Sequence, residues 1–343
     1  MKLDIAPQFA TNEVPIVITP HKGFIPCMGV LVQSIIENSN KKNNYDIIVL
    51  HKEVDDGSVV KFQKQIEGRK NFSIRFINIK EYSFQNHFFK KNERNINFPS
   101  ATYYRLFIPE LFQKFEKVIY MDADMIVLSD VAELMNVDMG NNLVAAVRDI
   151  CGNWNYYEED KVVKNYRDNE LCLKNPDNYF NAGMVVFNIR EFKYINESGE
   201  IWRKVNQKKW RSKDQDILNM LCNDRIFLLP FYWNMIRDCQ ENAFIYMKKE
   251  DKVAWNTCNE DAKIVHFAGG RKPWSYLYVP FQDKYWEYAK KSPFMEDNFK
   301  IIGEAQLENF VRSKNLEGKI GYSFIIKMVK DWILVRMKVL FGR

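Results

Sequence analysis

The chain has 343 residues, of which 46% are hydrophobic and 15% aromatic, enough to bury one large core. A formal net charge of +6 is too mild for a nucleic-acid-binding protein, and no nucleic-acid-binding motif occurs in the sequence. The six cysteines are scattered without a C-x-x-C pair, which argues against zinc and redox motifs and predicts reduced thiols in a cytoplasmic protein.

Short apolar runs alternate with helically spaced segments in the first part of the chain. Strands alternating with helices predict an α/β fold with a mainly parallel, Rossmann-like sheet covered on both faces. Ligands bind such sheets outside the carboxyl ends of the strands. We expect strands at 14–19, 45–50, 72–79 and 117–121, with helices at 27–38, 58–67 and 102–112.

The second part continues the pattern less regularly. We expect strands at 143–147, 184–188 and 263–267, helices at 190–207 and 214–222, and a loop at 269–274. The stretch 150–179 is rich in Asn, Tyr and charged residues and is long enough to be a functional loop. Together with 231–256, we expect it to shape an acceptor pocket.

Two acids spaced by one residue follow the apolar strand at 117–121. In extended backbone the side chains of Asp122 and Asp124 point to the same side. Two hard oxygen ligands suit Mn²⁺ or Mg²⁺ and leave room for phosphate oxygens. The alternative is a polar turn that merely ends a buried strand.

Five elements in a fixed order carry a family resemblance: Arg105 in Thr102–Leu106, the Asp122/Asp124 pair, Phe180–Gly183, Asp214–Asp216 and His266–Trp274. Together they resemble glycosyltransferase family 8, in particular bacterial galactosyl- and glucosyltransferases that extend lipopolysaccharide or capsule glycans. The resemblance covers roughly residues 14–275. It implies a GT-A fold, a UDP-sugar donor, Mn²⁺, and transfer of a hexose such as glucose or galactose with retention at the anomeric carbon.

The resemblance assigns the metal and diphosphate groups. It implies that His266 completes the metal site, although a histidine ending an apolar strand is by itself more often a hydrogen-bonded core residue. Gly269, Gly270 and Lys272 would bind the diphosphate through backbone N–H groups and one cation. The alternative for this loop is an ordinary turn before an aromatic anchor, Trp274.

The triplet 214–216 is expected to carry the chemistry. By resemblance, Asp214 holds a donor-sugar hydroxyl, Gln215 lies near the β-face of the anomeric carbon, and Asp216 supports them. The alternative is a capping box, because Ser212 and Gln215 have the required spacing. An amide oxygen is a poor nucleophile, so we favour front-face attack over double displacement, with Gln215 stabilising positive charge on the sugar.

Further donor contacts are implied at Ala123, Asn181 and Ala182 near strand ends, and at Arg105 on the helix predicted at 102–112, although most helix arginines are solvated. Asp149 follows the strand at 143–147 and is assigned to the sugar or acceptor side. One segment departs from the family pattern, because His21 stands where relatives carry an aspartate that reads uracil and ribose. Thr19 backbone and the Phe24 ring would then recognise the base.

Two other classes of function compete with this reading. A sugar nucleotidyltransferase also places acids on a Rossmann-like sheet, but the glycine-rich loop it needs after the first strand is absent. A nucleotide-sugar binding protein without turnover would be favoured by loss of a metal ligand or of Gln215, and all are present.

The remaining predictions concern membranes and domains. Residues 1–11 lack the apolar segment of a signal peptide, and no run of 18 apolar residues predicts a membrane span. We expect a catalytic domain at 1–280 and a helical region at 281–343, whose segment 319–343 has six cations against one acid and apolar residues at helical spacing. A basic amphipathic helix of this kind suits an anionic membrane interface, or packs on the protein's own core.

The cationic stretch 203–213 has the same two explanations, a solvated helix end or contact with an anionic acceptor or membrane. We therefore expect a cytoplasmic enzyme held at the inner face of the membrane and acting on a glycan or lipid-linked acceptor.

Overall fold

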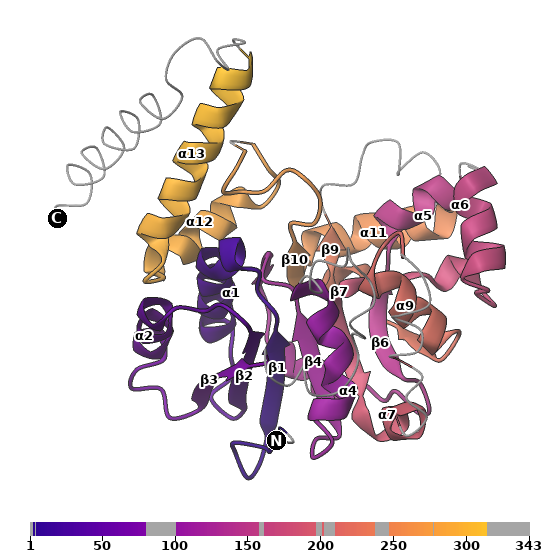
Figure 1. Cartoon of the computed structure of the whole chain (residues 1–343), viewed down its shortest axis with the longest axis horizontal. Coiled ribbons are helices and arrows are strands. Elements are labelled where there is room, and N and C mark those ends of the chain that lie inside the picture. The colour runs from indigo at the N-terminus through magenta and orange to yellow at the C-terminus, as the bar shows by residue number, and fades with distance from the viewer. Residues whose placement is uncertain are drawn as a thin grey trace, which may run out of the picture.

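A seven-stranded sheet forms the centre of the computed structural model, which describes residues 3, 5–79, 101–157, 161–196, 201, 210–236, 247–276 and 278–313. The strand order is β3-β2-β1-β4-β7-β6-β8 (Figure 1). The bounds are β1 Glu13–Ile18, β2 Asn44–His51, β3 Phe72–Asn78, β4 Lys117–Met121, β6 Val144–Arg148, β7 Phe180–Asn188 and β8 Ile226–Leu228.

Neighbouring strands of this sheet run parallel except around β7, which is antiparallel to both β4 and β6. The reversal brings the first residues of β7 to the edge where β4 and β6 end. A second, three-stranded sheet has the order β5-β10-β9, with β5 at Met125–Val127, β9 at Met235–Ile236 and β10 at Ile264–His266.

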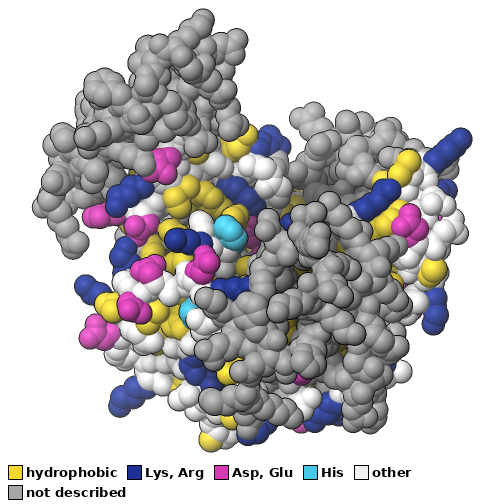
Figure 2. All heavy atoms as spheres, viewed as in Figure 1, with side chains coloured by type: hydrophobic (Ala, Val, Ile, Leu, Met, Phe, Trp, Pro, Cys, Tyr) yellow, Lys and Arg dark blue, Asp and Glu magenta, His cyan; other side chains and the backbone are white. Residues whose placement is uncertain are grey.

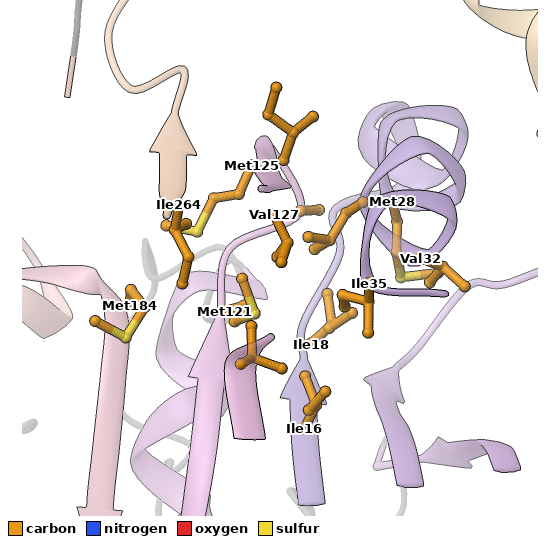
Figure 3. Packing of buried hydrophobic residues seen from close by; sticks show 14 of the residues in the cluster. Ile16, Ile18, Met28, Val32, Ile35, Met121, Met125, Val127, Met184 and Ile264 are labelled. Atoms are coloured by element: carbon orange, nitrogen blue, oxygen red, sulfur yellow. The ribbon is translucent and has the colours of Figure 1, made fainter. Parts of the chain in front are cut away.

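Helices cover both faces of the main sheet, which confirms the predicted α/β class. On one face, α1 (Ile25–Glu37) packs Met28, Val32 and Ile35 against side chains of β1, β4 and β5 (Figure 3). The helix α2 (Asp56–Gln65) begins where the Asp55 carboxylate accepts the Ser58 N–H, as an N-cap residue does.

The other face is covered by elements from the middle of the chain. They are the 3₁₀ helix η2 (Ala101–Phe107), α4 (Ile108–Leu111), α7 (Ile189–Asn196) and α9 (Asp214–Cys222). The single helix predicted at 102–112 is divided because Pro109 lacks an N–H and is accepted only in the first turn of α4.

Three strands escaped prediction because β5, β8 and β9 have only two or three residues, too few to show a period. The stretch 150–179 is largely helical, with α5 (Ile150–Tyr157), α6 (Lys161–Asn165) and a π-helical turn at Tyr166–Glu170 among its described residues. Short 3₁₀ turns complete the chain: η1 Lys22–Phe24, η3 Val131–Asn136, η5 Pro176–Asn178 and η6 Phe231–Trp233. The helix α11 occupies Lys249–Glu260.

The expected boundary at 280 falls just before α12 (Gln282–Lys291) and α13 (Met295–Ser313), and both helices pack on α1 (Figure 1). Phe294 is 1% exposed, and its ring centroid lies 4.4 Å from that of Phe62. Gly29 makes the approach possible, because a Cβ there would lie 2.2 Å from Phe294 Cδ2. Asn298 Nδ2 donates to the Pro26 carbonyl at 3.0 Å.

The segment 319–343 and residues 203–209 lie outside the described residues, so their predicted roles stay predictions. Among the helices that the structure does describe, none combines the length and the apolar character needed to cross a bilayer.

Candidate functional site

Two carboxylates and an imidazole converge at the carboxyl end of β4. Asp122 and Asp124 lie in the bend between β4 and β5, and His266 ends β10, which pairs with β5. His266 Nε2 lies 3.2 Å from Asp124 Oδ1 and 3.8 Å from Asp122 Oδ2. One ligand atom from each residue lies within 4.8 Å of the others, which is the geometry of a candidate metal site.

The orientation of His266 fits metal binding through Nε2. Its Nδ1 lies 3.1 Å from Asn234 Oδ1, an atom that only accepts, so Nδ1 carries a proton. Nε2 faces the carboxylates and is the atom that would bind a metal after losing its own proton. Asn234 is itself oriented, because its Nδ2 donates to Asn181 Oδ1 at 3.0 Å. Partners of this kind fix the tautomer of a metal-binding histidine.

Gly183 keeps the space between these ligands open. A Cβ on it would lie 2.3 Å from His266 Cε1 and 2.9 Å from Asp122 Oδ2. The absence of a side chain at this position therefore leaves room for His266 and Asp122.

Lys272 also reaches this site. Its ammonium donates to Asp124 Oδ2 and to the Phe267 carbonyl. Burial alone would raise the pKa of Asp124, but the neighbouring His266 and Lys272 outweigh it and hold the pKa well below its ordinary value. Asp124 therefore stays ionised, as a metal ligand must be.

Arg105 connects the metal side of the site to the sugar side. Its buried guanidinium donates to Asp122 Oδ1 at 2.9 Å and to the Ala182 carbonyl, and its Nε forms an ion pair with Asp214 Oδ2 at 2.8 Å. Burial opposes the charge of Arg105, yet the two carboxylates raise its pKa above the ordinary value. Burial raises the pKa of Asp214 to about 7, although Arg105 works in the opposite direction.

Gln215 has a fixed amide at the start of α9. Its Oε1 accepts the Ala182 N–H at 3.0 Å, and its Nε2 donates to Asp149 Oδ2 at 2.7 Å. Asp149 follows β6, so the pair joins the ends of two strands. The expected neighbours Asn181, Ala182, Asp149 and Gln215 are thus brought together.

The capping box considered for this helix does not form. The helix begins at Asp214, its N-cap residue Lys213 has a φ of 51°, and no side chain caps it. Asp216 instead reaches back to the Ser212 N–H at 2.7 Å. Because the same carboxylate accepts from the hydroxyls of Tyr166 and Tyr179, it lies behind the other two residues of the triplet as a support.

The residues expected to hold the nucleotide line one side of the site. Phe24 packs edge-on against Trp274, with centroids 5.9 Å apart, and lies beneath the Lys272 ammonium. Gly269 has a φ of 90°, and Gly270 is exposed with open space around it. On the face seen in Figure 2, acidic, basic and histidine side chains gather near the middle of the molecule.

Two residues of the site escaped the sequence analysis, Tyr120 and Asn234. The Tyr120 hydroxyl lies 2.6 Å from Asp122 Oδ1 and 3.0 Å from Thr19 Oγ1, and its ring carries the Arg105 guanidinium at 4.4 Å from the centroid. The two-residue spacing of Tyr120 and Asp122 in extended backbone was the signal available for the first. Asn234 belongs to no motif.

Comparisons with known proteins show the family to which the chain belongs. The model of Glycosyl transferase family 8 matches residues 15–277. General stress protein A of Bacillus subtilis is 28% identical over 199 residues, 55% of this chain and 64% of that protein. The lipopolysaccharide 1,2-glucosyltransferase of Escherichia coli K12 is 23% identical over 282 residues, 80% of this chain and 77% of that protein.

Two solved structures are similar over most of the chain. The WbbM bifunctional glycosyltransferase has a TM-score of 0.79 and 31% identity, covering 87% of this chain and 53% of its own. The galactosyltransferase LgtC, in complex with donor and acceptor sugar analogs, has a TM-score of 0.63 and 20% identity, covering 82% of this chain and 96% of its own. The second likeness bears on the fold alone. The chain spans about half of the WbbM chain and less than two thirds of the Bacillus protein.

The space left by Gly183 gives a testable expectation for metal binding. Gly183→Ala should weaken binding of Mn²⁺ by about tenfold or more, because the added methyl group displaces His266 or Asp122. Titration of Mn²⁺ by electron paramagnetic resonance, without nucleotide, measures the change. Gly23→Ala is the matched control, since its Cβ would meet nothing closer than 3.8 Å. Equal affinity of the two variants would refute the spacing argument.

Proposed function

Because the chain belongs to glycosyl transferase family 8, and its fold is the GT-A type, we propose that it transfers a hexose from a UDP-sugar to a glycan or lipid-linked acceptor, with retention and with Mn²⁺. The convergence of Asp122, Asp124 and His266 at the carboxyl edge of the sheet carries the proposal. Relatives named as lipopolysaccharide glucosyltransferases support a hexose such as glucose as the sugar.

The metal ligands would be Asp122 Oδ2, an Asp124 oxygen and His266 Nε2. A bound Mn²⁺ would neutralise the diphosphate as it departs. In the structure the Lys272 ammonium donates to Asp124 Oδ2, one of the proposed metal ligands. When metal and diphosphate bind, Lys272 would donate to a phosphate oxygen instead. The exposed Gly269–Gly270 turn beside it would offer backbone N–H groups to the diphosphate.

The sugar would lie between the metal side and α9. Asp214 would accept a hydrogen bond from one sugar hydroxyl, and Asn181 would donate one to another. Arg105 would hold Asp214 in place. Gln215 presents a dipole that Asp149 and the Ala182 N–H already orient. Since its oxygen is engaged and is a poor nucleophile, Gln215 would stabilise developing positive charge during front-face attack.

The segment proposed to recognise the base, residues 19–24, differs from the family pattern. The His21 ring accepts a hydrogen bond from the Gly23 N–H and caps η1, so this nitrogen is already used within the chain and does not replace the aspartate of relatives. The backbone of Thr19 and the ring of Phe24 remain the proposed contacts for uridine.

The competing functions lack support in the described residues. A binding protein without turnover would be favoured by loss of a metal ligand or of Gln215, and all of these residues are present. A nucleotidyltransferase would require a glycine-rich loop after β1, where the chain has residues 19–24 with one glycine.

Incubation with a panel of radiolabelled sugar nucleotides, with and without Mn²⁺, tests the function. Transfer or slow hydrolysis of one UDP-hexose should depend on Mn²⁺, and Asp122→Asn and Asp124→Asn should each lower turnover by ~10²-fold or more. Asp261→Asn, at an exposed position after α11, is the control. Full activity of the site variants in EDTA would sink the metal assignment, and a β-linked product by proton NMR would refute retention.

Gln215→Ala separates catalysis from binding. Turnover should fall by ~10²-fold while the UDP-sugar still binds nearly as tightly, because the amide acts on charge that develops only in the transition state. Calorimetry measures binding and a thermal melt checks folding. Loss of donor binding in a folded variant would make Gln215 a binding residue instead.

The acceptor side is proposed to face a membrane. We infer that segment 319–343 attaches the enzyme peripherally to the cytoplasmic leaflet, where each cation near an anionic surface contributes ~1 kcal/mol. Deleting 319–343 should release the protein from anionic vesicles and leave UDP-sugar hydrolysis unchanged. A truncated protein that unfolds, or that still sediments with vesicles at low salt, would contradict the anchor.

A further inference from the structure

Tyr120 stands between the end of β1 and the first metal-side carboxylate. The residue is fully buried in β4, and its hydroxyl lies 3.0 Å from Thr19 Oγ1 and 2.6 Å from Asp122 Oδ1. Thr19 directly follows β1 and belongs to the proposed nucleoside side. A continuous hydrogen-bonded chain therefore runs from that side to a proposed metal ligand.

The direction of the protons in this chain follows from the groups at its end. The Asp122 carboxylate only accepts, and Arg105 Nη2 already donates to Oδ1, so the Tyr120 hydroxyl must donate to the same oxygen. Because the Tyr120 hydroxyl uses its hydrogen in the bond to Asp122, its oxygen accepts a hydrogen bond from the Thr19 hydroxyl.

The two donors give the two oxygens of the Asp122 carboxylate different partners. Oδ1 receives Tyr120 and Arg105, while Oδ2 is directed toward His266, 3.8 Å from Nε2. A carboxylate held in this way presents one oxygen to a cation and cannot rotate to present both.

We propose that Tyr120 is a positioning residue, which fixes Asp122 as a one-oxygen metal ligand and ties that ligand to the nucleoside end of the site through Thr19. This inference rests on the proposed metal site. Packing in the strand would require only the aromatic ring, which a phenylalanine also has, so the inference gives the Tyr120 hydroxyl a role of its own.

The chain contains a matched control for the loss of this hydrogen bond. Tyr45 is also fully buried in a strand of the main sheet, and its hydroxyl donates to Asp130 Oδ1 at 2.7 Å. Asp130 caps η3 and belongs to no candidate site. Tyr45→Phe therefore removes a tyrosine–aspartate hydrogen bond of the same kind from the same sheet without touching the metal side.

Titration of the full chain with Mn²⁺ alone, followed by electron paramagnetic resonance, tests the proposal. Tyr120→Phe should bind Mn²⁺ about tenfold more weakly than the wild type, since loss of a group that orients a ligand has effects of about 10–100-fold. Tyr45→Phe should lower the melting temperature and leave Mn²⁺ affinity unchanged. In turnover assays, Tyr120→Phe should raise the Mn²⁺ concentration needed for half activity, with activity recovering at saturation.

The outcomes separate this inference from the function on which it rests. A wild-type chain that binds no Mn²⁺ would remove the metal assignment and the inference with it. Wild-type binding that Tyr120→Phe leaves unchanged, or that Tyr45→Phe weakens equally, would overturn the role of Tyr120 alone. If Tyr120→Phe does not fold, Thr19→Val keeps the ring and removes only the upstream donor; it should weaken Mn²⁺ binding about threefold, and an unchanged affinity would again overturn the proposal.

Discussion

The buried guanidinium of Arg105 is the interaction on which the site depends. Asp122 and Asp214 lie on different elements, and both would be costly to bury as lone anions. One planar cation with several donors pairs with both, and its remaining hydrogen bonds to the backbone of residues 102 and 182 fix its position. Removing it would leave the buried Asp214 and the half-buried Asp122 without their cation, which destabilises more than the net contribution of the pairs.

The reversed strand β7 explains how these groups meet. Because β7 is antiparallel to β4 and β6, its first residues lie at the edge where those strands end. Asn181 then contacts Asn234, Ala182 contacts Gln215 and Arg105, and Gly183 leaves room for the metal-side ligands. A strand running in the other direction would carry this polar start to the opposite edge.

Prediction from the sequence succeeded where a residue type and a spacing both carried information. Asp122 and Asp124 follow an apolar strand, and in the structure His266 and Arg105 lie beside them while Gln215 contacts Ala182. The roles assigned to these residues stay predictions. Asn234 could not be found in this way, because its role depends on what lies across the fold, whereas the spacing of Tyr120 and Asp122 was a signal that went unused. The helix α9 has the predicted bounds, but the capping box considered as an alternative does not form, because Asp149 and Ala182, distant in sequence, hold the Gln215 amide.

The contact between Gly29 and Phe294 ties two ends of the chain to each other. No side chain fits at position 29 while the ring is present, and no smaller side chain at 294 would fill the space above the glycine. A substitution at either of these two positions, 265 residues apart, would therefore cost stability unless the other position changed with it. Exchange of the C-terminal helices between relatives would therefore succeed only if the first helix came with them.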